Sequence, residues 1–246
     1  SFTYVMSDKI SRERTFFQYR GANAHFSEDS FNWVDIDCDL IHIAYILLLD
    51  ELDKEDREYG TKMARLLAHA KERGIKTSID VVSETGERFG RLVPPALRYT
   101  DYCIINEIEA SRSTGIQLRA ADGALIYENV KKVLSKLFEL GVSEWAVIHS
   151  PEGGFGMDKD GDYAECGLVY TPSGFIKGKV GAGDAFCAGV LSAAHRGLSL
   201  LDAVKLGNAA ATVSLRSPGA TEAMETIEET MRICSELGFE PVKLNK

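Results

Sequence analysis

A carboxylate stands beside a glycine-rich turn in the stretch Gly181-Ala182-Gly183-Asp184, which runs directly into a small, apolar segment of helical character. The first N–H groups of a helix have no partner inside it, and the helix dipole adds partial positive charge there, so such a turn can hold an anion. Glycine also lets a ligand approach the backbone closely because it has no Cβ atom. Asp184 is then either a first-turn acid that stabilises the dipole or a general base that takes a proton from a hydroxyl attacking phosphorus.

A second polar pattern, Asn106-x-x-Glu109, follows a short apolar run at residues 101–105. It is open to two interpretations. Asn106 can cap a helix that carries acids in its first turn. Alternatively, the amide and the carboxylate can organise a phosphate-bound Mg²⁺, an ion that prefers oxygen ligands and often keeps its waters.

Alternating strand and helix patterns surround both motifs. Residues 40–49 are nearly continuously apolar, as in a strand buried on both faces of a parallel sheet. Periodicity and turn residues predict the remaining elements: strands at 75–82, 101–105 and 145–149, a hairpin at 155–166 turning at Asp160-Gly161, helices at 54–73, 125–140, 183–196, 201–215 and 221–237, and an irregular stretch containing Pro94-Pro95.

This alternation predicts an α/β fold with three αβα layers and a mostly parallel central sheet. Ligands bind such sheets at the carboxyl ends of the strands. Asn106, the turn after His149 and the turn before Asp184 all fall at such ends, so we expect them to share one site. No repeat or linker interrupts the 246 residues, and we expect a single domain over 1–246.

The amino-terminal residues carry two β-rich runs, 2–6 and 15–19, around a polar turn. This pattern predicts a hairpin. An isolated hairpin is marginally stable in water, so it needs a partner surface: the substrate, the core or a second subunit. An ordinary edge hairpin is the simpler alternative.

Composition excludes several classes of function. A net charge of −9 argues against a general binder of nucleic acid or of membrane surfaces, and no apolar run approaches the roughly 20 residues of a membrane helix. The five cysteines are odd in number, widely spread and without a C-x-x-C pair, which predicts reduced thiols and a cytoplasmic protein.

Together, Gly-Ala-Gly-Asp with the following Ala185-Phe186 and the upstream Asn-x-x-Glu closely resemble the signatures of the ribokinase-like (PfkB) family of carbohydrate kinases. The resemblance covers nearly the whole chain. It implies transfer of the γ-phosphoryl group of ATP to a hydroxyl of a sugar or related small alcohol. It further implies that Asp184 is the base, that the amides of residues 181–184 form the anion hole, and that Asn106 and Glu109 act on the Mg²⁺–phosphate group.

The resemblance assigns binding roles to further residues. Gly154, Asn208 and Gly219 of Pro218-Gly219-Ala220 match positions near the nucleotide, although Asn208 can equally be a helix residue paired to backbone. Residues 1–25 are similar to part of the β-lid that covers the sugar and often mediates dimerisation, which implies a homodimer through the lid. Asn23 and Asp50 lie near the sugar site, while a solvated strand end is the alternative for Asp50.

Three departures from the family pattern bear on function. The opening strand, the sugar-gripping Gly-Gly loop and the first half of the lid are missing, so we expect either a fragment or a protein whose acceptor site is incomplete or supplied otherwise. Gly178-Lys179 replaces Asp-Thr, so a monovalent cation is not among the expected cofactors, and Lys179 would place a fixed charge near the phosphates. His149-Ser150-Pro151 replaces the T-x-G turn, so ATP affinity or nucleotide choice is expected to differ.

Two other functions are compatible with these motifs. A non-catalytic relative would bind a nucleotide or sugar and act as a sensor or interaction subunit. A nucleoside kinase on the same fold would differ only in its acceptor, which the sequence does not identify.

Overall fold

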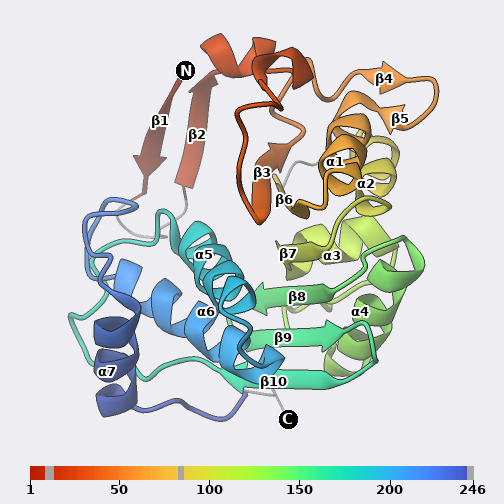
Figure 1. The fold of residues 1–246 in the computed structure, drawn as a ribbon. Helices are drawn as coiled ribbons and strands as arrows, with labels where there is room; N and C mark the ends of the chain where they lie inside the picture. The colour runs from red at the N-terminus through yellow and green to blue at the C-terminus, as the bar shows by residue number, and fades with distance from the viewer. Residues whose placement is uncertain (9–13, 83–85, 243–246) are drawn as a thin grey trace.

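A six-stranded sheet forms the centre of the computed structural model, which describes residues 1–8, 14–82 and 86–242 (Figure 1). Its strands lie in the order β10-β9-β8-β7-β6-β3; β3, β6, β7 and β8 pair in parallel, whereas β9 pairs antiparallel with both β8 and β10. Their bounds are β3 (Leu40–Ile46), β6 (Lys76–Val81), β7 (Tyr102–Asn106), β8 (Trp145–Ser150), β9 (Gly153–Asp158) and β10 (Tyr163–Gly167).

Helices cover both faces of this sheet, and this gives the predicted three layers (Figure 1). One group is α1 (Lys62–Glu72), α2 (Phe89–Leu97), α3 (Glu107–Thr114) and α4 (Val130–Glu139). The other is α5 (Ala182–His195) and α6 (Leu200–Ser214), with α7 (Ile227–Leu237) packed on α6.

Each central strand contributes to two hydrophobic cores. Ile104 and Val147 pack toward α5 and α6, whereas Ile105 and Ile148 pack into the core formed with α1, α2 and α4. Successive side chains of a strand point to opposite faces. The continuous apolar runs of the sequence are therefore explained by burial on both sides.

The amino-terminal hairpin forms as predicted, from β1 (Phe2–Ser7) and β2 (Arg14–Tyr19). It is a separate two-stranded sheet that projects from the body of the molecule (Figure 1). Large apolar side chains lie exposed along both strands: Phe2, Tyr4, Val5, Met6, Phe16, Phe17 and Tyr19.

Several predicted boundaries are wrong. The strand predicted over 40–49 ends at Ile46, and the helix predicted from residue 125 begins at Val130. The helix predicted from residue 54 begins at Lys62, because Asp56 accepts hydrogen bonds from the N–H groups of Glu58 and Tyr59 and holds a turn between two short strands, β4 (Glu55–Asp56) and β5 (Gly60–Thr61). The helix predicted from residue 221 begins at Ile227, where Thr226 caps it.

A further correction concerns Pro94-Pro95, which lie inside α2 rather than in irregular chain. Proline removes a helical hydrogen bond and is disfavoured there. Burial of an apolar face by Phe89, Leu92 and Val93 outweighs that cost here.

Two predictions drawn from composition agree with the structure. All five cysteines are free, and four of them are buried. Within the described ranges, none of the helices combines the length and apolar character that crossing a membrane requires.

Asp101 joins three elements at the edge of the sheet opposite the strands' carboxyl ends. It accepts hydrogen bonds from Lys71 Nζ (2.6 Å), the Thr77 N–H (2.9 Å) and Ser143 Oγ (2.8 Å). Burial acts to raise the pKa of the Asp101 carboxyl, but the Lys71 ammonium and these hydrogen bonds outweigh it and hold the pKa below its usual range.

We expect Asp101→Asn to lower the free energy of unfolding by about 3 kcal/mol at pH 7. A depressed carboxyl pKa stabilises the fold above the unfolded pKa of about 4, so the deficit should shrink as the pH falls below that value. Urea titrations at several pH values measure it. Glu139→Gln, which breaks only the exposed Lys136 pair, is the control and should change little. An equal deficit at pH 3 and pH 7 would contradict this account.

Candidate active site

The glycine-rich turn before α5 lies flush against the Pro218–Ala220 segment. Gly181 has a φ of +77°, and a Cβ atom built on it would lie 2.8 Å from Ala220 Cβ. A Cβ on Gly178 would lie 2.6 Å from Pro218 Cα. The two sequence motifs, far apart in the chain, thus form one surface whose backbones touch, and side chains at these glycines would separate them.

Asp184 lies exposed in the first turn of α5. Gly181 is the N-cap, and no side chain of the described residues caps this helix. The N–H groups of Ala182, Gly183 and Asp184 are those that a helix cannot satisfy internally. The geometry expected for an anion site is therefore present, with a carboxylate beside it.

Tyr45 approaches Asp184 from the end of β3. Its phenolic O–H donates a hydrogen bond to Asp184 Oδ1. The register of β3 against β6 shifts between Ile43 and Ile46, and both Tyr45 and Leu47 have positive φ values, +64° and +86°. Such values are rare for bulky residues. This bulge turns the tyrosine toward the start of α5.

Acidic side chains concentrate at the carboxyl ends of the strands. Burial first, and then the negative charges of Glu109 and Asp184, raise the pKa of Asp80, on β6, to about 8. The pKa of the Tyr45 phenol is also raised, by burial first and then by Asp184. Both shifts have burial as their largest cause, with neighbouring negative charge acting in the same direction.

Two imidazoles border the same region without adding positive charge. Burial lowers the pKa of His149 to about 4, against the opposing effect of Asp184, and burial also lowers the pKa of His42. His149 stacks on Phe186 with ring centroids 5.0 Å apart, and a Cβ on Gly183 would lie 3.3 Å from its ring. His149 is thus a neutral, packed wall beside the anion site.

Asn106 and Glu109 form a capping box at the start of α3. Asn106 Oδ1 accepts from the N–H groups of Ile108 and Glu109, both at 2.9 Å, and Glu109 Oε2 accepts from the Asn106 N–H at 3.0 Å. Asn106 also pairs with His149 across β7 and β8. The cap is therefore formed, and it fixes the Glu109 carboxylate, which is buried, at the sheet edge near Asp80.

A half-buried arginine, Arg119, holds the start of α3 against the turn between β8 and β9. Arg119 donates to Glu107 at 2.7 Å and to both oxygens of Glu152, at 2.5 and 2.8 Å. Glu107 precedes Glu109 by two residues, and Glu152 follows His149 by three. This bridge keeps the capping box and the His149 turn in register.

The residues matched to the nucleotide site divide into two groups. Lys179, exposed in the turn, and Gly219, in the segment pressed against it, lie beside the start of α5. Asn208 is 3% exposed, and its amide donates to the carbonyls of Cys166 and Gly167, both at 2.9 Å. Gly154 is buried where a Cβ would lie 2.7 Å from a Val204 methyl group. In the structure, Asn208 and Gly154 therefore act in packing: Asn208 holds α6 to β10, and Gly154 allows β9 to approach α6.

The residues matched to the sugar site meet at the base of the hairpin. Arg20, directly after β2, forms an ion pair with Asp50. The N–H of Glu51 donates to the carbonyl of Ala24 at 3.1 Å, so the chain around Asn23 runs beside the chain around Asp50. Asp50 is therefore tied to the hairpin rather than being only a solvated strand end.

Sequence reasoning missed Tyr45, Asp80 and His42. All three lie on the predicted strands, and Asp80 is the penultimate residue of β6. A polar residue within the last positions of an otherwise apolar parallel strand is a usable signal for such a site. The positive φ of Tyr45, in contrast, results from a bulge that no local sequence pattern predicts.

The donor set fits a hydrated magnesium ion. In the part of the chain that the structure describes, no cluster of three or more His, Cys, Asp or Glu forms a ready metal cage. Mg²⁺, however, commonly binds through one or two carboxylates together with waters and substrate phosphates. Asp80 and Glu109 are the two carboxyl groups at this edge that would supply such ligands, and the charge of Glu109 contributes to the raised pKa of Asp80.

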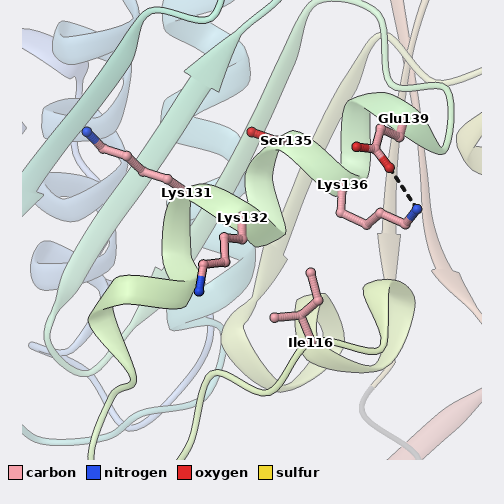
Figure 2. A pocket seen from close by; sticks show the side chains of 6 residues that line it. All are labelled: Ile116, Lys131, Lys132, Ser135, Lys136 and Glu139. Carbon is pink, nitrogen blue, oxygen red and sulfur yellow. Dashed lines mark hydrogen bonds and ion pairs between the residues drawn. The ribbon is translucent and has the colours of Figure 1, made fainter.

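A separate hollow of about 420 Å³ lies along α4. Figure 2 shows its lining, in which Lys136 pairs with Glu139 and Lys131 and Lys132 extend from the helix. None of its lining residues belongs to the site around Asp184.

Comparison with known proteins identifies the family and the fold of the chain. The model of the family described as pfkB family carbohydrate kinase matches residues 1–227. A curated relative, 2-dehydro-3-deoxygluconokinase of Bacillus subtilis, is 37% identical over 81 residues, which cover 30% of this chain and 24% of that protein. The matched stretch is thus about a quarter of the relative's length.

Solved structures share the fold at low identity. A 2-dehydro-3-deoxygluconokinase from Thermotoga maritima superposes with a TM-score of 0.73 at 18% identity, over 95% of this chain and 73% of that one. A ribokinase from the same organism gives 0.70 at 19% identity, over 95% and 69%. These likenesses establish the ribokinase-like fold.

We expect Gly181→Ala to destabilise the chain more than Gly174→Ala. Both positions have nearly the same φ, +77° and +79°, so each alanine should cost about 1 kcal/mol of backbone strain. Gly174 has open space around it, whereas Gly181 faces Ala220, which should add roughly 1–3 kcal/mol of overpacking. Chemical denaturation of the two variants measures the difference, and equal losses would show that the contact is unimportant.

Proposed function

The chain belongs to the pfkB family of carbohydrate kinases, and from this premise we propose that it transfers the γ-phosphoryl group of ATP to a hydroxyl of a sugar or related small alcohol. The observation that carries the proposal is the position of Asp184, an acceptor of protons in the first turn of a helix whose free N–H groups face the same space. The finer roles below are part of the proposal.

Asp184 takes the proton of the acceptor hydroxyl as that oxygen attacks the γ-phosphorus. The N–H groups of residues 181–184 stabilise negative charge on the transferring group, and Lys179 adds a fixed positive charge beside them. Such catalysis rests on positioning and electrostatics more than on covalent chemistry. Closely packed glycines support it, because they keep the amides fixed before the nucleotide arrives.

Asp80 and Glu109 would hold Mg²⁺, with the capping box of Asn106 fixing the second carboxylate. The ion would neutralise phosphate charge when bound. Asn208 and Gly154 then act on the nucleotide site indirectly, by fixing β9, β10 and α6.

The acceptor site would be completed by the hairpin. We propose that residues 1–25 form part of a lid in a single domain spanning 1–246, with Asn23 and Asp50 at its base. The exposed aromatic residues of β1 and β2 favour a homodimer through the lid, since a two-stranded sheet with apolar side chains needs a covering surface. Free cysteines fit a cytoplasmic location.

One observation favours a second candidate, a relative that binds nucleotide or sugar without turnover. The Asp184 carboxylate already accepts a hydrogen bond from Tyr45. If that contact is permanent, the base is unavailable and the chain acts as a sensor. Binding of ATP without ADP release on any acceptor would favour this alternative.

We expect Asp184→Asn to lower kcat by roughly 10²- to 10⁴-fold while ATP affinity changes little. Coupled ADP release with Mg²⁺ against a panel of sugars, sugar acids including 2-dehydro-3-deoxygluconate, and nucleosides provides the assay. Asp202→Asn is the matched control, because Asp202 is likewise the first-turn acid of its helix. Asp184 is not the base if both variants retain wild-type turnover.

We expect Glu109→Gln to raise the Mg²⁺ concentration for half-maximal ADP release on the order of tenfold. Glutamine keeps an oxygen for the capping box but removes the charge. Glu229→Gln, at the equivalent third position of α7, should leave the Mg²⁺ requirement unchanged. An unaltered Mg²⁺ titration in Glu109→Gln, with thermal stability intact, would remove Glu109 from the metal site.

A further inference from the structure

Tyr45 occupies the hydrogen-bonding position that the proposed reaction reserves for its acceptor. The phenolic O–H donates to Asp184 Oδ1. An acceptor alcohol must direct its own O–H to this carboxylate before transfer, because the base takes that proton. The protein therefore presents Asp184 with an internal hydroxyl that resembles the one it would deprotonate.

The backbone around Tyr45 is fixed, while its ring is not enclosed. Ile46 and Leu47 are 1% and 0% exposed and anchor the chain in the core, and the left-handed φ of Tyr45 sets the direction of its side chain. The Tyr45 side chain itself remains 39% exposed. Rotation of the ring toward solvent would therefore not require the core to move.

Negative charge near Tyr45 favours its role as a donor. Burial first, then the hydrogen bond to Asp184 and the neighbouring acidic groups, raise the pKa of the phenol, so it keeps its proton. Asp184 is the acidic group to which it is hydrogen bonded. The contact thus combines a neutral O–H donor with an anionic acceptor, which is stronger than a hydrogen bond between neutral groups.

We propose that Tyr45 is a specificity-determining residue of the acceptor site, which holds Asp184 until an acceptor hydroxyl displaces it. The inference rests on the proposed kinase function. An acceptor that displaces the phenol forms a bond from its oxygen to the γ-phosphorus, the bond from that phosphorus to the bridging oxygen breaks, ADP leaves, and Asp184 receives the proton. Water, which has no further contacts with which to move the ring, stays excluded, so ATP is not hydrolysed unproductively.

Two variants separate the hydroxyl from the ring. Tyr45→Phe keeps the ring and removes the competing O–H, so the KM for the acceptor should fall several-fold with kcat nearly unchanged. Tyr45→Gly suits the positive φ and removes the ring, so acceptor-independent ATP hydrolysis should rise at least tenfold and further acceptors in the panel should react. Tyr170→Phe, an exposed tyrosine on another part of the chain, is the control and should match wild type.

The outcomes distinguish this inference from the function on which it rests. One outcome would overturn the role of Tyr45 and leave the kinase intact: the wild type turns over, and both Tyr45 variants stay within twofold of it. The twofold limit applies to the KM for the acceptor and to the rate of ATP hydrolysis without acceptor. ATP binding with no ADP release from wild type, Tyr45→Phe or Tyr45→Gly on any acceptor would overturn the kinase and the inference with it. Thermal unfolding of each variant confirms that it is folded. If Tyr45→Gly is not folded, the test rests on Tyr45→Phe, which is nearly isosteric with the wild type.

Discussion

The site depends on one close approach of backbones, between the turn at Gly178–Gly181 and the segment at Pro218–Ala220. Only residues without a Cβ permit it, since added atoms would lie well inside contact distance of the facing chain. This contact fixes the direction of the chain as it enters α5. The N–H groups of its first turn can therefore be directed at an anion before any ligand binds, so that no binding energy is spent on ordering them.

Charge at the carboxyl edge of the sheet is arranged around that helix start. Glu109 and Asp184 bring negative charge, which acts with burial to raise the pKa of Asp80. Half-buried His149, whose pKa burial lowers to about 4, adds no positive charge. A nucleotide with its metal ion would bring the missing positive charge, while the helix dipole and Lys179 would meet the phosphates. The phenol of Tyr45 donates its hydrogen bond to the same carboxylate, so the proposed general base and the proposed control of acceptor entry share Asp184.

Much of this could be predicted from the sequence because the signals were local. The apolar run at 40–49 identified a strand, although β3 lies at the edge of the sheet, is mostly half-buried and ends at Ile46. Asp160-Gly161 identified the turn of its hairpin. The helix starts at residues 62 and 227 were missed because side chains of Asp56 and Thr226 hold turns that periodicity does not register. Within the site, the Gly-Ala-Gly-Asp motif itself predicted a glycine-rich turn at a helix start with Asp184 in the first turn. Tyr45 could not be found this way, since its direction is set by a bulge against β6. Nor could the packing roles of Gly154 and Asn208, because they depend on contacts between α6 and strands that are distant in the sequence.

The central claim, that the start of α5 holds the transferring phosphoryl group, is tested most directly by a crystal structure of this chain with Mg²⁺ and a non-hydrolysable ATP analogue. The account predicts γ-phosphate oxygens within hydrogen-bonding distance of the N–H groups of residues 181–184, with the metal ion on the side of Asp80 and Glu109. An analogue bound elsewhere, or a γ-phosphate directed away from these amides, would contradict it.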